Sequence, residues 1–184
     1  AELARHAGLT GAPQASELAR LLGQSSGGVS VDDVPEGPRY VVFVVGGVEC
    51  AMPAACVQGI DRLVDVTPVP HTAAWVLGVM QFRGTIVSVV DLAEFLQVPT
   101  AARGVPSRLL IVSQGGMSIA FVVDAVLEMR AESSGMREDH SVSPPHWLSR
   151  YAAGVLESGD RKVVRVDAHE LLFAEPIHQY QSET

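Results

Sequence analysis

Two aspartates, Asp91 and Asp167, occupy matching positions in two similar stretches of the sequence. Paired carboxylates in two β-rich repeats can share one proton and activate water, as in aspartic proteases. Those enzymes carry a glycine-rich loop after each aspartate, whereas Leu-Ala and Ala-His follow here. Each aspartate also directly precedes a short helical pattern, where its carboxylate can accept hydrogen bonds from free backbone amides. We therefore expect helix caps rather than a hydrolytic pair.

The other residue types that support catalysis or metal binding are not spaced for either purpose. The six histidines form no H-E-x-x-H motif, and Cys50 and Cys56 have no histidines at zinc-site spacing. The sequence also lacks a phosphate-binding G-x-x-x-x-G-K-[ST] loop and a G-x-S-x-G nucleophile motif. We predict no enzyme activity, no cofactor and no metal site.

The residue best suited to binding a partner is Arg83, which lies between Phe82 and Gly84 at the tip of a predicted hairpin. A hairpin tip does not need an arginine for the core, and arginine is enriched at interface anchors. The alternative is a solvated turn charge. Val57 and Ile60 share one short apolar segment, which either belongs to the core or lines a groove for a partner helix.

Composition excludes several classes of partner. The net charge is −8 at pH 7 and the basic residues are scattered, which argues against nucleic acid and anionic lipid. The chain is 47% hydrophobic, enough for a real core, but no apolar run approaches the roughly 18 residues of a membrane span. Two cysteines in apolar surroundings do not make a disulfide framework. We expect a cytoplasmic protein without membrane insertion.

The elements that must position these residues come in two similar sets. Residues 75–96 reappear, degraded, as residues 151–172, and the spacing from Gly78 to Asp91 equals that from Gly154 to Asp167. A second pair of similar segments precedes the two copies: F-V-V-G-G-V-E-C-A-M lies before the first copy and I-V-S-Q-G-G-M-S-I-A before the second. Such a duplication predicts a body with pseudo-twofold symmetry and a cleft between its halves.

Glycine turns separate short β-branched runs throughout this body. We predict hairpins over residues 40–52, 76–90, 109–123 and 151–166, with short helices after the two aspartates. Close turn spacing without long crossover helices favours small antiparallel barrels or sandwiches over a parallel sheet. The segment 56–63 fits a helix or a strand.

The expected organisation has three parts. Residues 1–38 form a helical N-terminal extension and linker, residues 39–176 the body, and residues 177–184 a polar tail. The two repeats within the body cover about residues 40–96 and 108–172. About seven extra residues lengthen the second repeat, in the loop 133–145.

Several motifs in this order resemble the CheW-like domain of bacterial chemosensory adaptors. They are Y-V-V-F-V-V-G-G-V-E-C-A-M-P, C-V-Q-G-I, V-T-P-V-P, G-V-M-Q-F-R-G-T-I-V-S-V-V-D-L, I-A-F-V-V-D-A-V and the closing Y-A-A-G-V-L followed by V-V-R-V-D. The resemblance runs from about residue 40 to residue 172.

The resemblance implies a mainly β fold of two five-stranded SH3-like barrels, one per repeat, around a shared apolar core. It also implies a non-enzymatic adaptor that couples methyl-accepting chemoreceptor tips to a CheA-type histidine kinase, recruited from the cytoplasm to membrane-associated arrays. Receptor contact is implied in the groove between the lobes, at the positions matching Val57, Gly78 and Arg83. Ile60, Phe82 and Gly84 join this predicted site as their neighbours.

Some residues depart from the family pattern. Gly59-Ile60-Asp61 stands where the family has an acidic residue followed by Ile and Arg, and His71 stands where asparagine is usual. These departures favour a pathway other than flagellar swimming, such as twitching or surface sensing. Two alternatives stay open: a regulatory module of a larger signalling protein, and an SH3-like peptide binder outside chemosensing.

Overall fold

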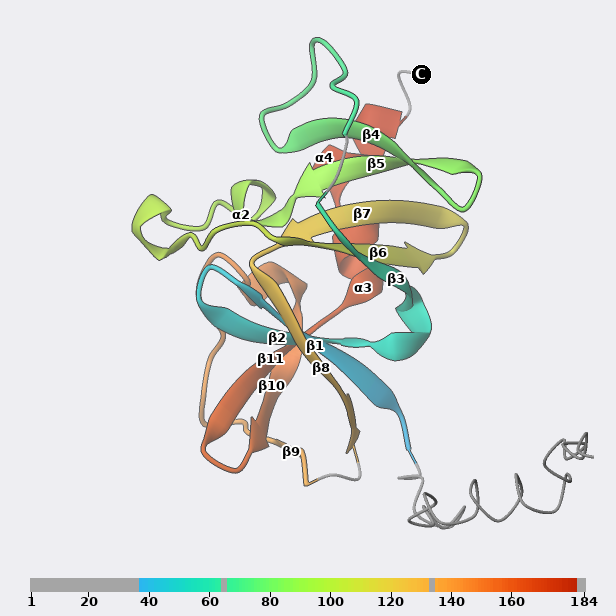
Figure 1. The fold of residues 1–184 in the computed structure, drawn as a ribbon. Helices are drawn as coiled ribbons and strands as arrows, with labels where there is room; N and C mark the ends of the chain where they lie inside the picture. Colours follow the sequence, from blue (N-terminus) through green and yellow to red (C-terminus); the bar gives the residue numbers. More distant parts are fainter. Residues whose placement is uncertain (1–36, 64–65, 133–134, 182–184) are drawn as a thin grey trace, which may run out of the picture. The chain divides into compact units, whose positions relative to one another are not determined.

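The structure is a computed structural model that describes residues 37–63, 66–132 and 135–181. The described residues belong to one compact unit, and most of it is built from two β-sheets (Figure 1). The predicted helical N-terminal extension and linker, residues 1–38, lies outside the described residues except for residues 37 and 38.

The first sheet takes strands from both ends of the body. Its neighbours pair antiparallel, except that β2 and β11 run parallel. The strands in spatial order are β8 (Ala125–Ala131), β1 (Arg39–Val45), β2 (Val48–Pro53), β11 (Arg161–Val166), β10 (Ala152–Ser158) and β9 (Arg137–Glu138).

The second sheet repeats this order with the remaining strands. Here β5 and β7 form the parallel pair, and the other neighbours are antiparallel. The strands in spatial order are β3 (Val57–Arg62), β6 (Arg108–Gln114), β7 (Met117–Val123), β5 (Thr85–Asp91) and β4 (Val76–Phe82).

The two repeats exchange their first hairpins. The hairpin β1–β2 of the first repeat lies in the sheet of β8, β10 and β11, while β6–β7 of the second repeat joins β3, β4 and β5. The expectation of one barrel per repeat is therefore wrong. Neither sheet is a parallel sheet, as expected, although each contains one parallel pair. A tight turn fixes only the register within a hairpin, and the sheet that receives the hairpin is decided by tertiary packing.

The predicted hairpins themselves are confirmed. The turns Gly46–Gly47, Arg83–Gly84 and Gly115–Gly116 have positive φ at both residues, and the fourth turn has φ +61° at Gly159. Positive φ at the turn gives a backbone twist that matches the flanking strands. The segment 56–63, left open between helix and strand, forms β3.

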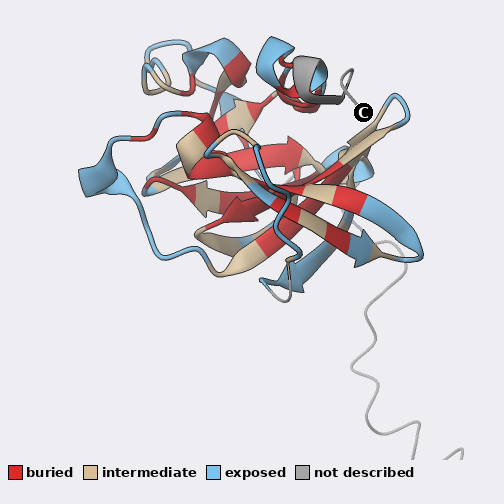
Figure 2. Ribbon diagram, turned by 90° about the horizontal axis from the view of Figure 1, so that it is seen from above, coloured by how far each residue is buried: buried red, intermediate tan, exposed pale blue. Residues whose placement is uncertain are grey.

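The core is shared between the sheets, as expected. One large cluster contains residues of both sheets, among them Phe43, Cys50, Leu110 and Phe121. Two smaller clusters lie on the other faces of the sheets, represented by Met80 with Ile111 and by Tyr40 with Leu156. Figure 2 shows the buried segments in the middle of the strands and the exposed segments at turns and loops.

Three α-helices complete the described body. The predicted helices after the aspartates are present as α2 (Leu92–Phe95) and α3 (Ala168–Leu172). A further helix, α4 (Glu175–Gln181), was not expected, and its Ile177 is only 3% exposed in the shared core. No helix in the described ranges is long and apolar enough to cross a membrane.

Candidate functional site

Both aspartates that could form a catalytic pair are helix caps. The Oδ1 atom of Asp91 accepts a hydrogen bond from the Glu94 amide at 3.0 Å. The Oδ1 atom of Asp167 accepts from the amides of His169 at 2.9 Å and Glu170 at 3.1 Å. The capping prediction is confirmed, and these hydrogen bonds account for an aspartate at the start of each short helix.

Arg83 lies at the exposed tip of the β4–β5 turn. Its backbone has φ +49° and that of Gly84 has φ +82°, as a two-residue turn requires. The Arg83 guanidinium carbon lies 5.0 Å from the centre of the Phe82 ring, a cation–π distance. Among the described residues no carboxylate forms an ion pair with Arg83, so the outer edge of its guanidinium can donate to a partner.

Phe82 connects the two edge strands of the second sheet. A Cβ atom on Gly59 of β3 would lie 2.7 Å from Cζ of the Phe82 ring at the end of β4, so the ring lies directly on the glycine. Hydrogen-bonded closure between β3 and β4 is not part of the sheet order. The contact brings the Arg83 turn close to the β3 edge.

The segment of Val57 and Ile60 divides between core and surface. Val57 is partly buried and packs against the shared core, whereas the Ile60 side chain is 46% exposed. Gly84 is exposed, and the position of a Cβ on it has no neighbour within 4 Å. The predicted site residues around Arg83 therefore present Ile60 and the turn to solvent.

Gly78 is buried, and its lack of a side chain allows two backbone segments to approach each other closely. Its φ is +144°, and a Cβ atom on it would lie 2.1 Å from the carbonyl oxygen of Thr67. Thr67 exchanges two backbone hydrogen bonds of 2.9 Å with Val79. Only glycine lets these two chain segments approach so closely. A receptor contact at Gly78 stays a prediction.

Two exposed apolar side chains on one strand were not predicted from the sequence to be candidate binding residues. Leu127 is 46% exposed and Met129 is 59% exposed, both on the edge strand β8. Pairing Val57 with Val126 in the repeat makes Met129 the counterpart of Ile60. That pairing was available in the sequence, and it would have marked β8 as a second edge with an outward apolar residue.

The first sheet has a charged network where the second has the Phe82–Gly59 contact. Arg161 pairs with Glu49 at 2.7 Å and with Glu128 at 3.0 Å, linking β11 to β2 and β8. Arg130 of β8 pairs with Glu128 at 3.2 Å and donates to the Ser158 hydroxyl of β10. The hydrogen bonds that Arg161 donates to Glu49 and then to Glu128 raise the pKa of its guanidinium. Corresponding strand ends in the two halves thus make different side-chain contacts.

The thiols do not fit a reactive site. Burial, followed by the charges of Asp124 and Glu49, raises the pKa of the Cys50 thiol far above its usual range. Burial and then the Asp167 charge raise the pKa of Cys56. Thiolates are the reactive form, so both residues are poor nucleophiles at neutral pH. In the part of the chain that the structure describes, no cluster of His, Cys, Asp and Glu could hold a metal ion.

The CheW-like domain family matches residues 39–175 of the chain. The chemotaxis protein CheW of Bacillus subtilis (strain 168) is 28% identical over 119 residues, covering 60% of this chain and 76% of that protein. The CheW of Helicobacter pylori is 25% identical over 162 residues, with coverage of 86% and 96%. Protein FrzA of Myxococcus xanthus is 32% identical over 92 residues, with coverage of 50% and 58%.

A solved structure confirms the fold. The scaffolding protein TtCheW from Thermoanaerobacter tengcongensis superposes with a TM-score of 0.63 at 22% identity, covering 77% of this chain and 96% of that one. At this identity the likeness concerns the fold alone.

Proposed function

This chain belongs to the CheW-like domain family, and we propose that it acts as a non-enzymatic adaptor between methyl-accepting chemoreceptor tips and a CheA-type histidine kinase. Relatives named chemotaxis protein CheW support the class of function. The adaptor works in the cytoplasm and is recruited to receptor arrays at the membrane.

The observation that carries the proposal is Arg83, which forms no ion pair with any described residue, together with the exposed apolar residue of edge strand β3. The Phe82 ring packs on Gly59 of β3, the strand that exposes Ile60. Chemoreceptor tips are helical bundles, and a helix docks well onto a surface that combines apolar contacts with one directed cation. Arg83 and Ile60 make this docking surface, and Val57 supports it from the core side.

The repeat adds a candidate second contact. Met129 and Leu127 expose apolar surface on β8 as Ile60 does on β3. Individual contacts of this size are weak, and many of them acting together give an array its strength. The kinase and the receptor therefore have separate apolar edges available on one body.

The experiment is receptor binding by Arg83→Glu. The change reverses a charge at an exposed turn without an ion pair in the described residues, so the thermal midpoint should stay nearly unchanged. We expect pulldown of the organism's own receptor cytoplasmic fragment to fall at least about tenfold, a typical loss for a directed charge contact. Arg137→Glu, at an exposed strand position of the other sheet, is the matched control. Equal binding by Arg83→Glu would remove Arg83 from the interface.

A pathway other than flagellar swimming remains part of the proposal. The departures at Gly59-Ile60-Asp61 and at His71 motivate it, since these positions lie near the proposed docking surface or on the loop before β4. Identification of the recovered receptor and kinase by mass spectrometry tests it. Partners encoded with flagellar genes would contradict this part without affecting the adaptor function.

A further inference from the structure

An apolar cleft of about 270 Å³ lies beside β4 and β5, away from the Arg83 turn. The loop before β4 forms one wall and Ile177 of α4 contributes to another. The cleft is lined by Val69, Thr72, Trp75, Val76, Gly78, Val79, Ser88, Val90, Ile119 and Ile177. Sites that enclose drug-sized ligands usually occupy about 300–1,000 Å³. This cleft lies just below that range, so it has room for an apolar side chain.

The internal repeat indicates what such a cleft holds. The Asp91 amide donates to the Trp75 carbonyl at 2.8 Å, and the Asp167 amide donates to the Tyr151 carbonyl at the same distance. These two hydrogen bonds fix the correspondence between the halves without a gap. Counting three residues back from Trp75 and Tyr151, Thr72 corresponds to Leu148.

The counterparts of two lining residues are large, apolar and buried. Leu148 is 1% exposed, and Val164, the counterpart of Ser88, is 5% exposed in the shared core. In the half that contains the first sheet, the chain thus supplies its own leucine and valine. In the half that contains the second sheet, the same positions carry Thr72 and Ser88, which are smaller and polar, and a cleft remains.

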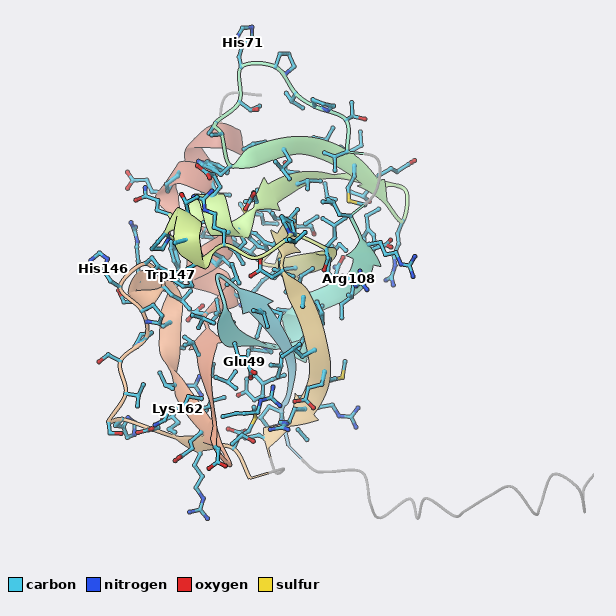
Figure 3. The ribbon with its side chains drawn as sticks, turned by 60° about the vertical axis from the view of Figure 1, so that its left-hand side comes forward. Glu49, His71, Arg108, His146, Trp147 and Lys162 are labelled. Atoms are coloured by element: carbon cyan, nitrogen blue, oxygen red, sulfur yellow. The ribbon has the colours of Figure 1, made fainter. Side chains whose placement is uncertain are left out.

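The loops that carry these residues also lie differently. Trp147 is packed against the shared core and lies 3.4 Å from the position of a Cβ on Gly46. Its counterpart His71 is exposed, with φ +61°. Figure 3 shows His71 at the outer tip of its loop and Trp147 against the body. The loop of Trp147 covers its half, whereas the loop of His71 leaves the cleft open.

We propose that the cleft is a binding site for one leucine-type side chain presented by a segment of another protein. The leucine takes the place that Leu148 fills in the other half. It packs against Val79, Val90 and Ile119, which are apolar residues from three strands of one sheet. Arg83 and Ile60 do not line this cleft, whereas Gly78, which is also a predicted receptor contact, does.

A small probe tests the site without the partner. N-acetyl-leucinamide is titrated into the full chain, with N-acetyl-alaninamide as the matched probe. We expect amide shifts in NMR spectra at Thr72, Val79 and Ser88 with the leucine probe only. The affinity for the leucine probe should exceed that for the alanine probe by at least about tenfold, because the leucine side chain buries three more carbon atoms than the alanine side chain. No shift, or equal shifts with both probes, would overturn the proposal.

Variants that restore the pattern of the other half provide the second arm. Ser88→Val and Thr72→Leu fill the cleft from within, so each should weaken the leucine probe at least about tenfold. Ser88→Val should keep the thermal midpoint equal or higher, whereas Thr72→Leu also loses the hydrogen bond that the Thr72 hydroxyl donates to the Val69 carbonyl at 3.0 Å. Thr85→Val makes the same type of change on β5 outside the cleft and should bind like the wild type. Undiminished probe binding by both filled variants would contradict the site. If the wild type self-associates and Ser88→Val does not, the occupant is a second copy and the proposed partner is wrong.

Discussion

The Cα atom of Gly78 faces the carbonyl oxygen of Thr67 so closely that a Cβ atom would lie 2.1 Å from that oxygen. The counterpart Gly154 has a similar φ of +152°, but a Cβ on it would meet nothing nearer than 3.8 Å. The same bulged backbone thus occurs twice, and only one copy is closed by a second chain segment. This difference separates the cost of the backbone angle from the cost of the clash.

We predict that Gly78→Ala destabilises the fold more than Gly154→Ala. The positive φ costs roughly 1–3 kcal/mol at either position. Gly78→Ala must also displace the Thr67 backbone, which should bring the total to about 3–5 kcal/mol. Urea denaturation of both variants measures the two losses. Equal losses would show that the residues 67–68 move away without cost.

This result also bears on binding experiments. A substitution at Gly78 that abolishes receptor binding cannot be assigned to a lost contact, because the strand pair Thr67–Val79 is lost with it. Arg83 and Ile60 are exposed and are better probes.

The two aspartates should contribute as caps. Asp91→Ala and Asp167→Ala should each lower the free energy of unfolding by about 1 kcal/mol, whereas the asparagine variants, which still cap, should lose less. Asp167 accepts two amides and Asp91 one, so we expect the larger loss at Asp167. Chemical denaturation of the four variants checks this. Asparagine variants as unstable as alanine variants would exclude capping as the cause.

The stability of the protein should fall in acid partly because of Asp139. Hydrogen bonds from Lys162 and then from Ser141 hold the pKa of the Asp139 carboxyl well below its usual range. The unfolded chain binds this proton near pH 3.9, whereas the folded chain binds it only at lower pH. The stabilisation is therefore present above about pH 4 and is lost as the pH falls through the folded value.

Asp139→Asn removes this contribution and isolates it. We expect wild type and variant to differ in urea midpoint at pH 7, and the difference to shrink at pH 3. A difference that stays constant between these pH values would contradict the role of the carboxylate.

Local chemistry made much of this fold predictable. Glycine pairs such as Gly46–Gly47 identify hairpins because few other residues adopt positive φ, and Asp91 and Asp167 identify helix starts by the amides that they accept. The repeat follows from spacing alone. Each of these signals lies within a few residues of the structure that it predicts.

The features that the sequence did not reveal depend on distant segments. The exchange of β1–β2 with β6–β7 leaves every hairpin unchanged. It is recorded in the pairing of β1 with β8, β2 with β11, β3 with β6 and β5 with β7. The packing of Phe82 on Gly59 joins residues 23 positions apart in the sequence. The burial of Ile177 needs the assembled sheet, because a lone isoleucine in a polar segment carries no periodic pattern.

Co-sedimentation tests the central claim of coupling most directly. Membranes containing the organism's own chemoreceptor are mixed with its CheA-type kinase, with and without the full chain, and the kinase in the pellet is measured. We predict that the kinase sediments several-fold more when the chain is present, and that Arg83→Glu removes most of this gain. Kinase recovery that is the same with and without the chain would contradict an adaptor function.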